Sequence, residues 1–422
     1  MKSAQLLSLL LISFGVVVFG CDAVEARSRN KSSSGFVLAR HLSSAVEIDA
    51  ESAGLDAQGR ATAARRHTAN SFTPGSPYIA GSRRANAGGN LHGAREEEIE
   101  AAMPIWLPGQ SEALHQTIDA SLVETDERLA LRRLDVAGLV REAWWRAQRA
   151  AREAEIAQSR LATARDIGSD MTRRETLGES GRQDTLLAQN ETLAAESEVA
   201  QAEAANRAAR AAYSVLTNGL TPDGALEAAG RGGPIEDHPA LRAPLAALKR
   251  AEAQIRLVDA SFIENPEVGV FGRHETNQEY QFGKPPEELF KTDSATFGFR
   301  FKVPLPTPGR NEPRRAEAEA DYVKAHAEYE RALRLVNAEV AAASAALAAA
   351  RRNLAVAGKR FAVASEQYEL ARKSFRLGEA NAVDLYRVRQ SYLDAKRAQA
   401  MAQVDVGVAD SRLNQARGYA PE

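Results

Sequence analysis

The feature that most constrains this 422-residue chain is an internal duplication. Three pairs of matching residues lie 200 residues apart: Pro104 and Pro304, Gly178 and Gly378, and Asp184 and Asp384. A period this long far exceeds that of a solenoid or propeller repeat. The sequence therefore predicts two similar half-molecules, at 37–220 and 238–418. We expect a linker at 221–237 between them and a short tail at 419–422.

Each half is expected to contain a pair of β-strands. In the second half, Phe297, Phe299 and Phe301 alternate with Arg300 and Lys302, which gives one apolar and one charged face. We expect strands near 266–273 and 295–303, separated by a polar loop, and weaker ones near 77–83 and 98–104. Strands of about nine residues can span a membrane in a β-barrel, but short soluble hairpins are an open alternative.

Long helices follow each strand pair. From Ala318 to Phe375, apolar residues recur at spacings of three and four, with one four-residue insertion after Val336. This pattern predicts a coiled-coil helix with a single stutter. A helix of that length would measure about 87 Å. Gly178 and Gly378 mark the tips where each long helix reverses into a second one. The fold class is therefore mainly α with a small β part, built as a duplicated half-molecule.

The N-terminus is expected to be an export signal at residues 1–26, because Lys2 precedes an apolar run too short to span a membrane as a helix. Two cleavage sites are open in this segment. A bacterial lipoprotein would be cleaved before Cys21 and acylated on that residue, whereas an ordinary signal peptide would be cleaved after Ala26. Residues 27–36 are expected to form a flexible leader. No other stretch reaches the ~18 apolar residues of a membrane-spanning helix.

Composition and motifs exclude several function classes. The formal net charge is −2, so nucleic acid is not an expected partner. One cysteine and seven scattered histidines form no metal-ligand motif, and we expect no metal site and no cofactor. No serine, histidine and acid occur at an interpretable catalytic spacing. We therefore expect the protein not to be an enzyme.

Four strands cannot close a membrane barrel, so a membrane-embedded sheet would require several copies. The order of the repeats and several short motifs resemble the TolC-type outer-membrane efflux channels from Leu38 to Gly418. The motifs are Asn265-Pro266-Glu267-Val268, Pro304-Leu305-Pro306 with Arg310-Asn311, and Leu377-Gly378 followed by Val383-Asp384-Leu385 and Gln390. His238-Pro239-Ala240-Leu241, together with Arg310-Asn311, resembles the CzcC-like branch that serves heavy-metal pumps.

This resemblance implies a homotrimer in the outer membrane of a Gram-negative bacterium. Three chains would share a twelve-stranded barrel and an α-helical tunnel across the periplasm. It implies a passive exit duct for metal cations or small toxic compounds, served by an inner-membrane resistance-nodulation pump. A periplasmic adaptor would contact the tips at Gly178 and Gly378. Phe297, Phe299 and Phe301 would then face lipid, and Arg300 and Lys302 the lumen.

Asp384 and Asp184 lie where the family has acids near the tunnel entrance. Three copies of Asp384 would form a charge ring, although an acid in the first turn of a helix is also favoured by the helix dipole. Arg387 stands where a second acid often occurs in the family, so the sign of the ring is open. Two other functions are open: an exported coiled-coil scaffold without a pore, and the exit duct of a type I protein secretion system.

Overall fold

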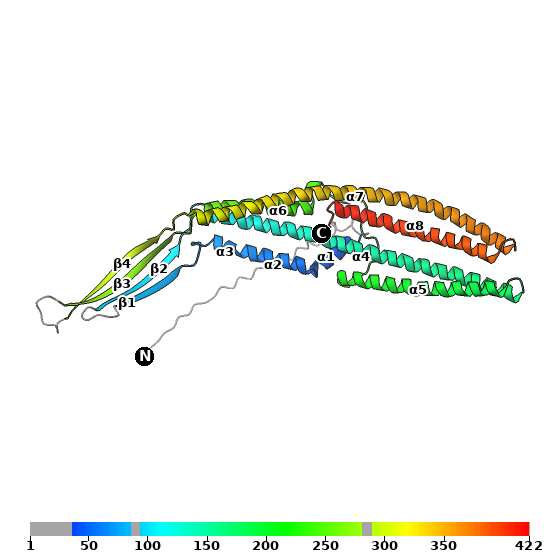
Figure 1. The fold of residues 1–422 in the computed structure, drawn as a ribbon, viewed down its shortest axis with the longest axis horizontal. Helices are drawn as coiled ribbons and strands as arrows, with labels where there is room; N and C mark the ends of the chain where they lie inside the picture. Colours follow the sequence, from blue (N-terminus) through cyan, green and yellow to red (C-terminus); the bar gives the residue numbers. More distant parts are fainter. Residues whose placement is uncertain (1–35, 86–92, 281–288, 422) are drawn as a thin grey trace, which may run out of the picture.

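The computed structural model describes residues 36–85, 93–280 and 289–421, which form one elongated molecule with a sheet at one end and helical hairpins at the other (Figure 1). The expected signal peptide, Cys21 and residues 27–35 of the expected leader lie outside the described residues. Phe36 pairs with Ala225 of the linker in an isolated parallel bridge. The observed single-chain fold is largely helical with a small antiparallel sheet, as the sequence predicts.

The sheet has four antiparallel strands in sequence order. They are β1 (Tyr78–Ala85), β2 (Gly93–Pro104), β3 (Glu267–Tyr280) and β4 (Leu289–Lys302). The central pair, β2 and β3, joins the two halves of the duplication. This order leaves one edge of β1 and one edge of β4 unpaired within the described part of the chain.

Strands β3 and β4 differ from the sequence prediction, because both extend into the segment 273–294 that was expected to be a polar loop. Each is 14 residues long, and their pairing continues from Glu267 opposite Lys302 to Tyr280 opposite Leu289. Strand β2 likewise begins at Gly93 rather than near residue 98. These outer parts are mostly polar on both faces, so they lack the regular apolar alternation by which a half-buried strand is found in a sequence.

Four long helices form the other end of the molecule. They are α4 (Gln110–Thr176), α5 (Arg182–Leu216), α7 (Pro308–Arg376) and α8 (Ala382–Ala416). The two longest, α4 and α7, have 67 and 69 residues, or about 100 Å each. The chain reverses at Gly178 and Gly378, which both adopt left-handed backbone with φ of 76°. Glycine takes this conformation without the steric cost that a side chain would add.

The hairpins lie side by side in the order α5, α4, α8, α7 (Figure 1). Nearer the sheet, the shorter helices α1 (Leu38–Glu47), α2 (Ala50–Ala64) and α3 (Arg66–Ala69) lie along α4, whereas α6 (Pro239–Ala260) lies between α4 and α7. A short 3-10 helix, η1 (Ile235–Asp237), precedes α6. Because α4 contacts α8, the two halves of the duplication form one continuous row of helices.

The predicted seam on α7 is confirmed, since no member of the stripe from Ala318 to Phe375 is exposed and Val336 and Leu347 are buried. In the distal half this seam packs on α8. Between α4 and α8, the Trp145 ring occupies the space beside Gly407, where a Cβ atom would lie 1.9 Å from the ring. The Trp145 indole N–H donates to Ser411 Oγ at 2.8 Å. This fit joins the two hairpins above their tips.

One helix among the described residues, α7, contains an 18-residue window that is apolar enough to cross a membrane by length and composition alone. The sequence, in which no other stretch is judged to reach about 18 apolar residues, does not predict this window. Alanine accounts for much of this apolarity, since the run 341–350 is almost entirely alanine. On both sides of this window, α7 continues as the amphipathic coiled-coil helix described above.

The N-terminal helices, the linker and the C-terminal residues gather around the middle of α4. Arg141 of α4 is buried and pairs with Glu227 of the linker at 2.8 Å. The buried His41 Nδ1 lies 2.5 Å from the Tyr213 hydroxyl, and burial lowers the pKa of this histidine. His238 accepts a hydrogen bond from the Ala240 N–H at 3.1 Å and so caps α6. This histidine therefore helps hold the start of α6, and the region ties the N-terminal helices and the described C-terminal residues to the hairpins.

A pH-dependent contact holds α2 against α4. Asp49 caps α2 by accepting from the Ser52 N–H at 2.8 Å, and it also accepts from Arg132 Nε at 2.9 Å and Nη2 at 2.7 Å. The Arg132 hydrogen bonds hold the pKa of the Asp49 carboxyl well below its usual range. A carboxyl with a depressed folded-state pKa stabilises the fold above its unfolded pKa of about 4, and this stabilisation is lost as pH falls.

The variant Asp49→Asn keeps a capping side chain but loses the charged pair. At pH 7 we expect it to be less stable than the parent by about 1.5–3 kcal/mol, the usual contribution of a hydrogen bond to a charged group. The difference should narrow as the pH is lowered from about 4. Unfolding measured from pH 7 to pH 3 checks this prediction, and a difference that stays constant over that range would contradict it.

Candidate functional site

One face of the sheet is apolar and open. Phe297, Phe299 and Phe301 of β4 are 86%, 79% and 73% exposed. The strand register extends this face across the whole sheet, because Val270 lies opposite Phe299 and Ala101 lies opposite Val270. Large aromatic and branched residues therefore cover a continuous surface that no part of the described chain buries.

The apolar surface forms a band of limited height. Along β4 it runs from Ala295 to the exposed Val303, which at about 3.3 Å per residue and a barrel-like tilt corresponds to roughly 20–25 Å. Beyond Ala295 the same face becomes polar, with Asp293 and Lys291. The band thus has about the height of the apolar belt of an outer-membrane barrel.

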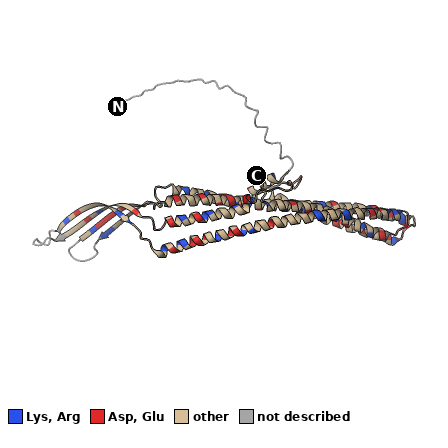
Figure 2. Ribbon diagram, turned by 90° about the horizontal axis from the view of Figure 1, so that it is seen from above, with Lys and Arg blue, Asp and Glu red and all other residues tan. Residues whose placement is uncertain are grey.

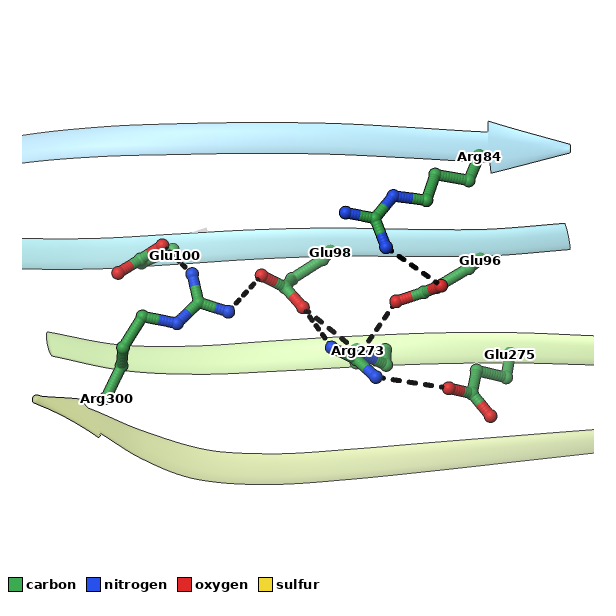
Figure 3. Close-up of polar contacts among 7 residues, drawn as sticks. All are labelled: Arg84, Glu96, Glu98, Glu100, Arg273, Glu275 and Arg300. Atoms are coloured by element: carbon green, nitrogen blue, oxygen red, sulfur yellow. Dashed lines mark hydrogen bonds and ion pairs between the residues drawn. The ribbon is translucent and has the colours of Figure 1, made fainter.

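The opposite face of the sheet carries a continuous network of ion pairs (Figure 3). Arg273 of β3 contacts Glu96 at 2.9 Å, Glu98 at 2.8 Å and Glu275 at 3.4 Å. Arg300 of β4 contacts Glu98 at 2.7 Å and also pairs with Glu100. This network crosses from β2 to β4, so charged groups hold the strands together on the face where Arg300 was expected to meet water.

Phe271 interrupts this charged face, and its ring lies between two guanidinium groups. The ring centroid is 5.1 Å from Arg300 and 5.8 Å from Arg273. Gly298 on the neighbouring strand makes room for it, since a Cβ there would lie 2.7 Å from the ring. Lys302 continues the face with an ion pair to Glu267 at 3.0 Å. The charged face is therefore an ordered surface rather than a set of free side chains.

The sequence alone does not indicate Glu96, Glu98, Glu100 and Arg273 as members of this face. The sequence does contain a sign of this charged face, because the three glutamates occupy alternate positions within β2. Arg273 and Arg300, which join the glutamates into one network, lie more than 170 residues away from Glu98, in the other half of the duplication. Only the pairing of β2 with β3 brings them together.

The hairpin tips hold the second group of expected site residues. Asp384 lies in the first turn of α8, where its N–H donates to the Asn381 side chain at 2.8 Å. Arg387 lies one turn later, 4.0 Å from Asp384, and both side chains are exposed. Asp184 occupies the equivalent position on α5 and is half-buried. Among the described residues no contact joins Asp184 to Asp384 or Arg387.

Arg389 differs sharply from Arg387, although it is only two residues away. Its side chain is 1% exposed and pairs with Glu191 of α5 at 3.1 Å. Its Nε and Nη1 atoms have no hydrogen-bond partner among the described residues, and its guanidinium lies 5.1 Å from the centroid of the Tyr386 ring. Burial in the same region raises the pKa of the Tyr386 hydroxyl. A buried cation with one acidic partner thus links α8 to the other hairpin.

A second link joins the hairpins at the same level. Arg174 of α4 lies 4.4 Å from the centroid of the Phe375 ring of α7. Met171, Phe375 and Leu385 form a buried apolar cluster that includes residues of both hairpins. The two tips are therefore held level and in contact within one chain.

The described residues contain no cluster of three or more histidine, cysteine, aspartate or glutamate side chains that could hold a metal ion. Charges of both signs are spread over the hairpins and the sheet (Figure 2). The surfaces that distinguish this protein are thus the two-faced sheet and the joined tips.

Known proteins resemble this chain in sequence and in fold. Residues 235–419 match the family of outer membrane efflux proteins. The match covers most of the second repeat and none of the first. No curated protein matches the chain by sequence.

About nine-tenths of the chain is similar in fold to solved outer-membrane proteins, at 91% coverage. A membrane protein from Pseudomonas aeruginosa is 20% identical with a TM-score of 0.70, and the match covers 91% of this chain and 95% of that one. The outer membrane protein VceC from Vibrio cholerae is 16% identical with a TM-score of 0.69, covering 91% and 97%. The MtrE outer membrane channel of Neisseria gonorrhoeae is 22% identical with a TM-score of 0.65, covering 91% and 89%.

Proposed function

We propose that this chain is the outer-membrane channel of a tripartite efflux system and acts as a passive exit duct across the periplasm and the outer membrane. The observation that carries this proposal is the sheet with one open apolar face, one charged face and two unpaired edges. The apolar band suits lipid, with Phe297, Phe299 and Phe301 facing the acyl chains. The charged face, with Arg300 and Lys302, suits a water-filled lumen.

The unpaired edges of β1 and β4 require further copies in a membrane, because open sheet edges do not occur in hydrocarbon. Three copies give twelve strands, within the range of outer-membrane barrels. The helices of three copies would then enclose a tunnel of about 100 Å. The match of residues 235–419 to the outer membrane efflux proteins and the similar fold of solved outer-membrane channels support this trimer.

At the far end of the tunnel, the exposed Leu177 and Leu377 flank the tip glycines, Gly178 and Gly378. We assign these tips to contact with a periplasmic adaptor, which would connect the duct to an inner-membrane resistance-nodulation pump. Asp384 and Arg387 would lie at the tunnel entrance. The cargo is assigned as metal cations or small toxic compounds, on the resemblance to the CzcC-like branch.

Two other functions use parts of the same structure. A periplasmic scaffold would need the hairpins but has no use for a lipid-sized apolar band on the sheet. An exit duct for secreted polypeptide would use the same barrel and tunnel, and would differ in its inner-membrane partner. Among these, the apolar band favours a membrane duct.

Ion selectivity in planar lipid bilayers tests the proposal. The purified protein should conduct in discrete steps, whereas a scaffold should not conduct. At a tunnel entrance lined by Asp384 and Arg387, the variant Asp384→Asn should shift the reversal potential in a salt gradient toward anion preference. Arg387→Gln should shift it toward cation preference, because fixed charge at a constriction sets the local ion concentration.

Asp394→Asn, on the exposed surface of α8 ten residues from Asp384, provides the matched control and should leave the selectivity unchanged. Equal reversal potentials in all three variants would remove Asp384 and Arg387 from the entrance. Absence of any conductance from the parent protein would contradict the channel itself.

A further inference from the structure

The outward face of the sheet, which carries the apolar band, becomes basic toward the strand ends that lie farthest from the helices (Figure 1). Resting on the proposed membrane barrel, we propose that this border binds a phosphorylated lipid of the outer leaflet. The phosphate groups lie over Arg83, Arg95 and Lys291, and an acyl chain fills a hollow in the apolar band. The ligand class is thus a membrane lipid that carries more than one phosphate group.

The strand register places these three cations on the outward face. Side chains alternate between the two faces of a strand, so Glu97 and then Arg95 follow the exposed Ile99 of the apolar face on β2. Arg83 of β1 lies directly opposite Glu97. Lys291 of β4 occupies the same face beyond the band. All three cationic side chains are exposed, so they form a basic border along the apolar band.

The cations are spread across the sheet. Strands β1 and β4 are three spacings apart, or about 14 Å at about 4.8 Å for each spacing. Arg83 lies level with Ala295 of β4, so Lys291 is also four residues, or about 13 Å, farther along the strands. Side chains this far apart cannot share one phosphate group. A lipid with two phosphate groups therefore fits the border better than inorganic phosphate.

The cations are available to a ligand. Arg95 makes no ion pair or hydrogen bond with the described part of the chain. Arg83 pairs with Glu97 at 3.2 Å, and their side chains are 62% and 48% exposed. Lys291 pairs with Asp293 at 3.1 Å and is similarly exposed. Exposed pairs of this kind contribute little to stability, so phosphate oxygens can displace the two carboxylates from the three cations.

A hollow of about 670 Å³ lies in the apolar face next to the basic border. In the register, Gly272 separates Ile99 from Phe297 and contributes no side chain, so the hollow opens between the two apolar side chains. Glu97 and His274 line the end of the hollow at the border. An apolar hollow beside a basic border fits an acyl chain joined to a phosphorylated head group.

The two ends of the outward face differ in charge. At the helix end, the described residues of the last row are uncharged: Met103, Val268 and Phe301 lie side by side. Because the proposed tunnel lies in the periplasm, the basic border lies on the cell-surface side of the membrane. The difference between the two ends therefore favours a lipid of the outer leaflet over one of the inner leaflet.

Retention of a labelled lipid by the purified protein tests this site. The probe is diphosphoryl lipid A, which is mixed with the detergent-solubilised protein and separated from free lipid on an affinity resin. The parent protein should retain the probe, and the double variant Arg95→Gln/Lys291→Gln should retain at least fivefold less. Each substitution removes a charged donor that a phosphate group would otherwise bind.

The matched control is Arg84→Gln/Lys302→Gln, which removes one arginine and one lysine from the charged face of the same sheet. It should retain as much probe as the parent protein. Ala101→Phe places a ring in the hollow without changing the charge, and it should also lower retention. If the first double variant does not form trimers, Arg95→Gln alone serves in its place, because it loses no contact within the described chain.

Equal retention by the parent and both double variants would overturn the site. Equal retention of lipid A without phosphate groups would also overturn it, because the acyl chains alone would then be sufficient. Complete displacement of the probe by millimolar inorganic phosphate would identify a free anion as the ligand and overturn the lipid. A parent protein that is a single chain and soluble without detergent would instead overturn the proposed channel.

Discussion

Replacing Phe299 by aspartate is expected to abolish assembly in the outer membrane. The side chain lies at the centre of the apolar band and is 79% exposed. The change removes an aromatic ring from lipid and places a carboxylate there, at a cost of roughly 3–5 kcal/mol per copy. Every copy in a closed barrel carries the same defect, so the amount of protein in the outer-membrane fraction should fall at least tenfold.

The matched control is Thr296→Asp, three residues earlier on the charged face of the same strand. Thr296 lies opposite Arg273 in the register, so an added carboxylate meets a basic neighbour and water. This variant should assemble like the parent protein. Normal membrane assembly of Phe299→Asp would contradict a lipid-facing role for the apolar band.

Replacing Glu191 by alanine is expected to loosen the hairpin tips more than any neighbouring surface change. Arg389 is 1% exposed and its one acidic partner is Glu191, whose side chain is 31% exposed. Loss of that partner leaves a buried guanidinium without compensation, and such losses typically cost 3–5 kcal/mol. Because Glu191 is partly exposed, we expect Glu191→Ala to lower the stability by about 3 kcal/mol, the lower end of this range.

The expected results are a lower melting temperature and a larger ion conductance of the purified protein, because the link between α5 and α8 is lost. Arg389→Met removes the buried cation itself, and the double variant Glu191→Ala/Arg389→Met leaves no charge unpaired. Both should be closer to the parent than Glu191→Ala alone. If Glu191→Ala instead matches the parent in both measurements, the pair does not hold the tips together.

The long-range order of the helices could be predicted from the sequence because it depends on a periodic pattern. The stripe from Ala318 to Phe375 is the seam found in the structure, including the insertion after Val336. The positions of the tips at Gly178 and Gly378 could also be predicted locally. Each turn has a left-handed backbone conformation at this position, which glycine adopts readily. Local and periodic signals of this kind do not depend on distant partners.

The candidate site was only partly predictable, because its remaining members depend on distant partners. Phe299 and Arg300 could be assigned to opposite faces by alternation alone. Glu98 could not be assigned, since its partners Arg273 and Arg300 belong to the other half of the chain. Arg389 and Arg387 also look alike in the sequence, since they lie only two residues apart near the start of α8. A rotation of about 200° between the two positions on α8 instead buries one and exposes the other.

The central claim is that copies of this chain enclose a continuous duct, and the most direct test is the mass and shape of the detergent-solubilised protein. Mass measurement combined with negative-stain electron microscopy should give three chains per particle. The particles should be hollow, longer than about 100 Å, and threefold in end view. Solid rods of one or two chains that remain soluble without detergent would contradict the channel and favour a periplasmic scaffold.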